Sequence, residues 1–229
     1  MTSGPQQPDA QPLRSDAERN RGRIIAAART VFERDGLGAS MASVAREAGV
    51  GIATLFRHFR AKEDLIAAVF ADRMDAYVTA VNAALDDPDA WAGFTGFIEA
   101  ICAMQAADRG FADVLTTTFP AAEALEQQRA AAYHGFLELI ARAKDSGHLR
   151  EDFASQDLVL LLIANAGIVN FAGDIIPDAW RRLVALLIQS FQAPARGPLP
   201  DPPADDSLYE AMLRAGPVSV TSRERNTDK

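Results

Sequence analysis

The sequence predicts an all-α protein, and three observations indicate this class. Apolar residues recur at spacings of three and four through most of the chain, the period of amphipathic helices. Glycine, proline and capping residues separate these stretches. The sequence shows no pair of alternating strands, no dinucleotide-binding glycine pattern and no internal repeat. With 48% apolar residues, the 229-residue chain is long enough for one or two domains with a buried core.

The N-terminal segment combines a polar arm with the first helix. Residues 1–13 are expected to be disordered, because they contain three prolines and three glutamines and little to bury. The first helix is expected to begin at Ser15 or Asp16 and to end at Gly36. Two functions remain open for the arginines at its start: contact with DNA phosphates or a minor groove, or a solubilising flank. These arginines are Arg14, Arg19, Arg21 and Arg23.

The stretch from Ser40 to Lys62 predicts two short helices joined by a tight turn. Ser40 is a candidate N-cap of the first, which covers Ala42–Ala48. Gly49 follows directly, and glycine adopts positive φ without steric cost. Leu55 and Phe59 are four residues apart and are therefore expected to face inward together.

The opposite face of the second short helix has the chemistry of a major-groove reader. Arg57 can donate two parallel bonds to a guanine edge, and Thr54 and His58 can bond to bases or phosphates. Ile52 or Ala53 can contact thymine methyl groups. The alternative is an ordinary helical hairpin with a solvated face.

The segment from about Arg14 to Phe70 resembles the N-terminal domain of TetR-family transcriptional regulators. The resemblance rests on residue type and spacing over three consecutive helices. The matching positions are Ile24-Ile25, Ala27-Ala28, Val31-Phe32, Gly36, Ala45, Gly49-Val50, Thr54-Leu55-Phe56, His58-Phe59 and Lys62-Glu63-Leu65. It implies a three-helix DNA-binding domain with a helix-turn-helix, followed by a helical ligand-binding and dimerisation domain.

The resemblance implies a set of DNA contacts, and the chain departs from the family's usual sequence at two positions. The residues expected at or near DNA are Ser40, Arg46, Ile52, Ala53, Thr54, Phe56, Arg57, His58 and Lys62. Phe56 stands where the family usually has tyrosine, so a phosphate bond from a hydroxyl is absent here. Gly51 stands where serine or threonine commonly caps the reading helix, which is a modest loss because glycine is an acceptable N-cap.

Charge divides the chain in the same place as the predicted domains. From Arg14 to Lys62 ten Arg/Lys face five Asp/Glu, whereas Glu63 to Lys229 contains thirteen against twenty-five. The net charge of −8 therefore conceals a basic N-terminal part that attracts phosphate and an acidic remainder that repels it. The predicted divisions are residues 1–13 (arm), 14–61 (DNA-binding domain), 62–192 (effector-binding and dimerisation domain) and 193–229 (a proline-rich, mostly disordered tail).

Six further helices are expected after the helix-turn-helix. One long helix from Lys62 to about Leu85 would link the two domains rigidly. The others are expected at 88–107, 109–117, 118–146, 155–172 and 177–191, with at most a short helix near 207–213 in the tail.

The resemblance assigns two functions to these later helices. The last two, 155–172 and 177–191, would pair with a second copy through Leu161, Ile168, Trp180, Val184, Leu187 and Phe191. The others would enclose a small-molecule pocket. Its candidate lining residues are Phe97, Ile101, Met104, Phe111, Leu115, Phe119, Tyr133, Phe136 and Asn165, with core packing as the competing role for each.

Several classes of function find no support in the sequence. The three histidines are scattered and lie at no metal-ligand spacing, and no catalytic motif is present, so no metal, no cofactor and no catalytic residue is expected. The longest apolar run, Leu158–Val169, is interrupted by Asn165 and too short to cross a bilayer. The polar N-terminus lacks a signal-peptide core, and the single cysteine, Cys102, is expected to be a packed core thiol, so a cytoplasmic location is expected.

The predicted function is therefore a ligand-responsive, DNA-binding transcriptional regulator and not an enzyme. Repression is the default implied by the resemblance, with a homodimer on a palindromic double-stranded DNA operator and release by a small, hydrophobic effector. The alternative is a helical protein-interaction adaptor with no DNA-reading role.

Overall fold

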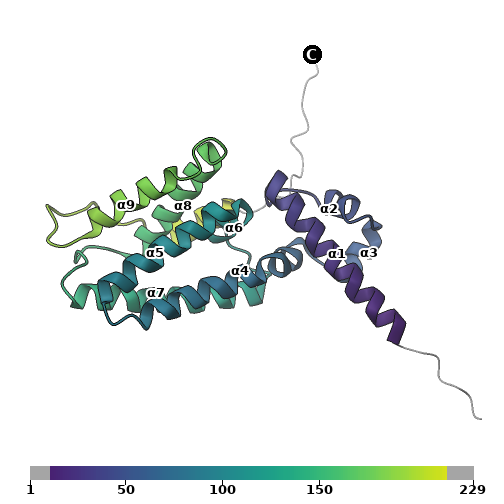
Figure 1. The fold of residues 1–229 in the computed structure, drawn as a ribbon, viewed down its shortest axis with the longest axis horizontal. Coiled ribbons are helices and arrows are strands. Elements are labelled where there is room, and N and C mark those ends of the chain that lie inside the picture. Colours follow the sequence, from purple (N-terminus) through teal and green to yellow (C-terminus); the bar gives the residue numbers. More distant parts are fainter. Residues whose placement is uncertain (1–10, 216–229) are drawn as a thin grey trace, which may run out of the picture.

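The computed structural model describes residues 11–215, which form ten α-helices and no β-strand (Figure 1). The helices are α1 (Gln11–Asp35), α2 (Met41–Glu47), α3 (Ile52–His58), α4 (Lys62–Leu85), α5 (Ala90–Ala107), α6 (Arg109–Thr116), α7 (Glu123–Asp145), α8 (Ser155–Ala172), α9 (Ala179–Phe191) and α10 (Asp205–Ala215). One isolated antiparallel bridge joins Leu149 to Gln192. The prediction of an all-α fold is confirmed.

Helices α1–α3 form a small unit, here called the head, beside a larger body built from α4–α9 (Figure 1). Helix α4 starts beside the head and continues into the body (Figure 1), and its buried side chains belong to one continuous core that includes residues of both parts. The Arg29 guanidinium of α1 donates a hydrogen bond of 2.9 Å to the Val69 carbonyl of α4. The Phe32 and Phe70 rings stack with centroids 6.4 Å apart. Head and body are therefore joined by packed side chains as well as by the chain itself.

The core of the body is rich in phenylalanine. Phe97 and Phe136 pack with ring centroids 5.5 Å apart, and Tyr77 stacks on Phe97 at 5.9 Å. All three side chains are buried, and burial raises the pKa of Tyr77 to about 12. Such aromatic pairs add about 0.5–1.5 kcal/mol each beyond the free energy of burial. The core of the body is therefore closely packed, and contacts between aromatic rings hold α4, α5 and α7 together.

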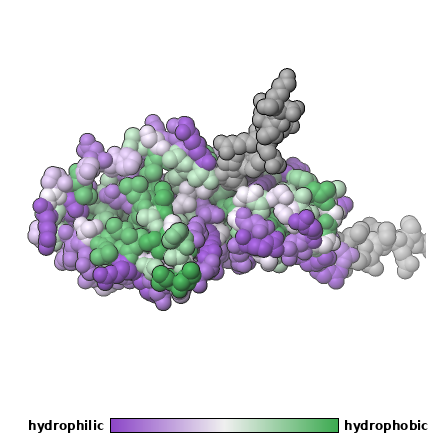
Figure 2. Space-filling view, turned by 90° about the horizontal axis from the view of Figure 1, so that it is seen from above, coloured by the Kyte–Doolittle hydropathy of each residue, from purple (hydrophilic) through white to green (hydrophobic). Residues whose placement is uncertain are grey.

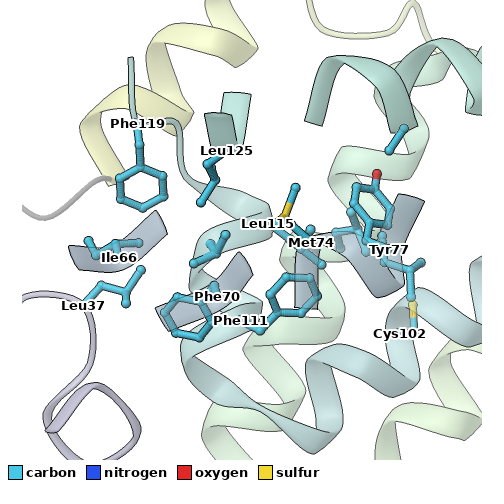
Figure 3. Packing of buried hydrophobic residues seen from close by; sticks show 14 of the residues in the cluster. Leu37, Ile66, Phe70, Met74, Tyr77, Cys102, Phe111, Leu115, Phe119 and Leu125 are labelled. Atoms are coloured by element: carbon cyan, nitrogen blue, oxygen red, sulfur yellow. The ribbon is translucent and has the colours of Figure 1, made fainter. Parts of the chain in front are cut away.

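Helix α6 lies where the head meets the body. Figure 3 shows Leu37 of the head pointing toward Ile66 of α4, with the Phe111 ring of α6 beside Phe70. The Phe70 and Phe111 centroids are 6.4 Å apart. Burial raises the pKa of Asp113, although a hydrogen bond from the Leu37 backbone partly offsets this effect. Helix α6 thus contacts both the loop after α1, at Leu37, and α4, at Phe70. Displacement of α6 would therefore disturb the packing between head and body.

The expected helix boundaries are correct to within a few residues, and the largest differences are at the starts of α1 and α7. Helix α1 already includes residues 11–13, which were expected to be disordered. Pro88 and Pro177 precede the first turns of their helices, which begin at Ala90 and Ala179. Helix α7 begins at Glu123, because the Glu126 carboxylate accepts a 2.8 Å bond from the Phe119 amide and holds the preceding residues in a separate turn.

The proline-rich segment after α9 is held against the body, contrary to the expectation of disorder for residues 193–204. The buried Arg150 guanidinium donates to the Gly197 carbonyl at 2.7 Å. The Asp152 carboxylate accepts from the Leu199 amide at 2.9 Å, and its pKa lies far below the usual value, chiefly because of the hydrogen bond from Arg150. Helix α10 then covers the short helix expected near 207–213. The expected disorder of residues 1–10 and 216–229 lies outside the described residues.

Helix α8 is longer than the apolar run that the sequence marks. Among the described residues it is one helix that, by length and composition, could span a membrane, which is weak evidence for such a role. Its inner face, including Leu161 and Leu162, packs in the body. Asn165 on the same face is completely buried and donates to the Gln105 side chain at 2.8 Å. One face of α8 therefore packs in the body, while Leu160 and Ile163 on another face are exposed.

The close approach of α4 and α5 gives a first prediction. A Cβ atom at Gly93 would lie 2.4 Å from the Ala84 carbonyl oxygen, which is backbone and cannot move aside. We expect Gly93→Ala to lower the free energy of unfolding by about 1–3 kcal/mol, measured by chemical denaturation. Gly96→Ala is the matched control on the same helix, with nothing within 4 Å of the new methyl group. It should raise stability by up to about 1 kcal/mol, and equal destabilisation by both variants would contradict this packing.

Candidate nucleic-acid interface

The turn between α2 and α3 has the geometry that the sequence predicts. The Ser40 hydroxyl accepts a 3.1 Å bond from the Ser43 amide and caps α2. Gly49 adopts φ +64°, and the Val50 amide donates to the Ala45 carbonyl at 3.0 Å. Arg23 of α1 donates to the Ala48 carbonyl at 2.8 Å and so holds the end of α2 against α1. Both ends of α2 are therefore fixed by specific hydrogen bonds.

Helix α3 is held by its inner face. Leu55 is fully buried and Phe59 is 2% exposed. The Arg21 guanidinium lies 5.1 Å from the centroid of the Phe59 ring, a cation–π contact. Since Leu55 and Phe59 fix the rotation of this seven-residue helix about its own axis, they also determine which side chains face outward.

The outer face of α3 presents apolar, aromatic and cationic side chains together. Ile52 is 43% exposed and Phe56 46% exposed. Ala53 and Arg57 are also exposed, whereas Thr54 and His58 are half-buried. This combination suits a groove with a hydrogen-bonding floor, because apolar atoms can meet thymine methyl groups beside the cation.

A hydrogen bond orients Arg57, and partial burial affects Lys62, the other predicted cation at this end of the head. Arg57 donates to the Thr54 hydroxyl at 3.3 Å, so the two groups lie together before any ligand is bound. Lys62 is the first residue of α4 and is half-buried. Its pKa is lowered because partial burial disfavours the charged ammonium, although Glu63 opposes this effect. A phosphate near Lys62 would stabilise the charged ammonium and so raise its pKa again.

The two remaining candidates lie on and just before α2. Ser40 and Arg46 are both exposed, so Ser40 can cap the helix and still face a ligand. Sequence reasoning missed Arg60, an exposed cation in the short connection from α3 to α4. Its position between the predicted contacts His58 and Lys62 was the signal that could have identified it.

Three arginines near the start of α1 make contacts within the head. Arg23 and Arg21 make the structural contacts described above and are thereby engaged within the head. Arg19 pairs with Asp16 on the exposed surface of α1. These contacts favour a structural role for Arg21 and Arg23 over free phosphate contacts.

Two family models match the chain over most of the described structure. The model for bacterial regulatory proteins of the tetR family matches residues 24–69, which contain the helix-turn-helix. The model for the C-terminal domain of SbtR-like transcriptional regulators matches residues 87–191, which contain α5–α9. The chain belongs to the TetR family. The resemblance seen in the sequence is thus confirmed, and it extends beyond the head into the body.

The known relatives agree with this assignment. An HTH-type transcriptional regulator of Staphylococcus aureus strain USA300 is 38% identical over 76 residues, or 33% of this chain. The chain spans only 41% of the length of that relative. Among solved structures, the ketosteroid transcriptional regulator KstR2 of Mycobacterium tuberculosis has a TM-score of 0.58 at 14% identity, covering 75% of this chain and 94% of its own.

A second similar structure is FadR from Bacillus subtilis, a transcriptional regulator in complex with stearoyl-CoA. It has a TM-score of 0.55 at 15% identity and covers 75% of this chain and 97% of its own. Identities this low show a shared fold and nothing finer.

The residues predicted to line an effector pocket in this TetR-family body mostly pack against one another. Phe97, Ile101, Phe111, Leu115, Phe119 and Phe136 are buried in the core, and Met104 is half-buried against it. Asn165 is buried in its bond to Gln105. Tyr133 is 40% exposed on the outside of α7, where its hydroxyl lies 3.1 Å from that of Ser155. None of the nine lines the three cavities described among the resolved helices.

The prediction of a wide pocket lining was too inclusive for a physical reason. Helical periodicity identifies the inner face of each helix, but a packed core and a cavity wall have the same pattern. Tyr133 was placed on the wrong side of α7. The single cysteine behaves as expected: Cys102 is fully buried, and burial raises its pKa to about 12.

The predicted dimer residues need a similar correction. Leu161, Trp180, Val184 and Phe191 are buried within the chain's own body, while Ile168 and Leu187 are half-buried. Helices α8 and α9 pack on α5 and on each other through these side chains. The predicted residues therefore lie mainly on the inner faces of α8 and α9. The exposed apolar residues of these helices, Leu160, Ile163 and Leu186, lie on neighbouring faces.

The positive φ of Gly49 gives a second prediction. A Cβ atom there would be strained by the left-handed backbone and would lie 3.3 Å from the Arg23 guanidinium that caps α2. We expect Gly49→Ala to destabilise the head by about 1–2 kcal/mol, measured by hydrogen exchange of α2 and α3 amides. Gly38→Ala, with open space around the new methyl group, is the control and should leave protection unchanged. Equal protection in both variants would contradict the turn geometry.

Proposed function

We propose that this TetR-family protein is a cytoplasmic transcriptional repressor that binds a palindromic double-stranded DNA operator as a homodimer and is released by a small hydrophobic effector. One observation supports the DNA-binding role above all others. The buried pair Leu55 and Phe59 turns the face containing Ala53, Phe56 and Arg57 outward, at the end of the molecule with a net positive charge.

The charge distribution supports an orientation of the complex. The segment from Arg14 to Lys62 has a net charge of +5 and the remainder from Glu63 a net charge of −12. Phosphates attract the head and repel the body, so DNA is expected to lie across α3 at the far side of the head from the body. The long-range attraction speeds encounter, while base contacts from α3 supply the choice of sequence.

The open faces of α8 and α9 support a dimer. Leu160 and Ile163 of α8 are 44% and 43% exposed, and Leu186 of α9 is 52% exposed. Gly167, on the same outer side of α8, has nothing within 4 Å, which would let a second helix approach closely. Figure 2 views the molecule from the side of α9 and shows hydrophobic residues gathered over the body. A soluble protein is expected to cover such a surface, and a second copy with two-fold symmetry does so.

Dimerisation has a geometric consequence for DNA recognition. Two heads related by a two-fold axis present two copies of α3, and the half-sites they read must be palindromic. For helix-turn-helix dimers the reading helices are about 34–36 Å apart, which is one turn of DNA. A change in this separation removes one half-site contact when the other is made.

The proposed effector binds in the body and acts by changing the distance between the two copies of α3 in the dimer. Support comes from the fold shared with regulators whose names mention a ketosteroid and stearoyl-CoA, each of which contains a large apolar part. It also comes from α6, which packs between the aromatic core and the loop after α1. A ligand that favours one position of α6 would shift the head relative to the body and release the DNA.

The competing function is a helical adaptor that uses its acidic body to bind protein. The relatives' names are those of transcriptional regulators. An adaptor that binds protein through its acidic body would not use the outward cationic face of α3. A DNA-binding variant distinguishes the two functions.

The double variant Arg57→Ala, Lys62→Ala tests the DNA-reading face. We expect it to weaken operator binding at least tenfold and to lower the slope of log K against log salt by about one unit per lost phosphate contact. The measurement is fluorescence anisotropy on a duplex selected from a random library, at several salt concentrations. Arg34→Ala is the control on the head, because Arg34 is engaged by Asp35 and Glu47. Unchanged DNA binding of the double variant with an intact dimer would contradict DNA reading by this face, and an unmodified chain that selects no duplex would favour the adaptor.

A further variant tests the dimer. Leu160→Glu with Ile163→Glu places two charges on the open face of α8 without touching its inner face. We expect the variant to sediment as a monomer at micromolar concentration where the unmodified chain sediments as a dimer. Leu137→Glu, on a residue of α7 that is 40% exposed, is the control and should leave the dimer intact. A monomeric unmodified chain, or a dimeric double variant, would contradict this interface.

A further inference from the structure

A cavity of about 340 Å³ lies at the junction between the head and the body, outside the aromatic core. Its walls come from α1, the junction of α5 and α6, and the connection from α8 to α9. One side is apolar, with Ile168, Val169, Ile176 and Trp180. The other side contains carboxylates, among them Glu33 of α1. The volume falls within the range of small-molecule sites in proteins, and the lining combines apolar side chains with four charged ones, Glu33, Asp108, Arg109 and Asp174.

The charges around this cavity favour a cation. Asp108 is buried, caps α6 by accepting from the Phe111 amide at 3.0 Å, and lies 3.5 Å from the Arg73 guanidinium. Asp174 pairs with Arg109 at 2.8 Å. These two carboxylates therefore have partners, and the first turn of α6 is already capped against an incoming anion.

Glu33 is the carboxylate that remains available. Its neighbour Arg34 is engaged by Asp35 and Glu47, and no ion pair of Glu33 is present within residues 11–215. The side chain is exposed at the mouth of the cavity. A ligand with an ammonium group at Glu33 could place an apolar group over Ile168 and Trp180 at the same time.

We propose that this cavity binds an amphiphilic organic amine, with its ammonium at Glu33 of the head and its apolar part against α8 and Trp180 of the body. The site lies outside the closely packed aromatic core of the body. Because Glu33 belongs to α1 and the apolar wall to α8, α9 and the connection between them, an occupant would bridge the head and the body. Such a bridge would favour the arrangement of the two parts in which the cavity is formed.

The test uses tryptophan fluorescence and no DNA, so its outcome is independent of the proposed regulation. The chain has two tryptophans, and Trp91→Phe leaves Trp180 in the cavity wall as the emitter. The probe is 4-phenylbutylamine, with 4-phenylbutanol as its neutral analogue and 5-phenylpentanoate as its anionic analogue. We expect a saturable change with the amine at one site per chain, and binding at least threefold weaker for the alcohol and weaker still for the carboxylate.

Two variants locate the bound amine. Glu33→Gln should weaken binding of the amine about threefold to fivefold and leave binding of the alcohol unchanged, whereas Glu18→Gln, an equal change of charge elsewhere on α1, should alter neither. Ala107→Leu, which adds volume at the cavity wall, should abolish binding of both. The proposal is overturned if the amine gives no saturable change, if the alcohol or the carboxylate binds equally well, or if Glu33→Gln and Glu18→Gln behave alike.

Discussion

The burial of Leu55 and Phe59 beneath α3 is the interaction on which the proposed function of this protein depends. A helix of seven residues has little stability of its own, so its orientation comes from the side chains that it buries. With Leu55 fully enclosed and Phe59 stacked under Arg21, the helix has one permitted rotation. That rotation exposes Ala53, Phe56 and Arg57 in the basic N-terminal part of the chain. The chemistry of the reading face is thus a consequence of hydrophobic packing on the opposite side.

The contact between head and body makes the position of this face sensitive to the rest of the molecule. Helix α4 enters both cores, and Arg29 binds its backbone at Val69. Helix α6 presses on Phe70 so closely that Gly110 has no room for a side chain, since a Cβ atom there would lie 2.8 Å from the ring. Close-packed contacts of this kind transmit displacement, because a shift of one element forces its neighbours to move. The same junction contains the cavity bounded by Glu33 and Trp180, so a ligand there would act directly on the relative placement of the two parts.

Much of this organisation could be predicted from the sequence, and the failures have a common cause. The cap at Ser40, the positive φ of Gly49 and the inward pair on α3 follow from local rules, because each depends on residues within one turn. The positions of Tyr133, Trp180 and Val184 depend on which neighbours the helices find, and periodicity alone does not choose among faces that are all apolar. The anchoring of the tail by Arg150 was missed for the same reason, since its partner Gly197 is distant in sequence. The lining of the junction cavity likewise comes from α1 and from the region around the connection after α8, which are distant in sequence. No local sequence pattern predicts such a cavity.

The most direct test of the central claim is affinity cleavage of DNA from the outer face of α3. Because Cys102 is buried and its pKa is raised to about 12, an iron chelate can be attached selectively to Ala53→Cys in the full-length protein. With a duplex selected from a random library, cleavage is expected at two positions about one helical turn apart, within a major groove. The same chelate at Ala130→Cys, on exposed α7 of the body, should give no localised cleavage. Uniform or absent cleavage from position 53, or equal cleavage from both positions, would contradict the claim that α3 reads DNA.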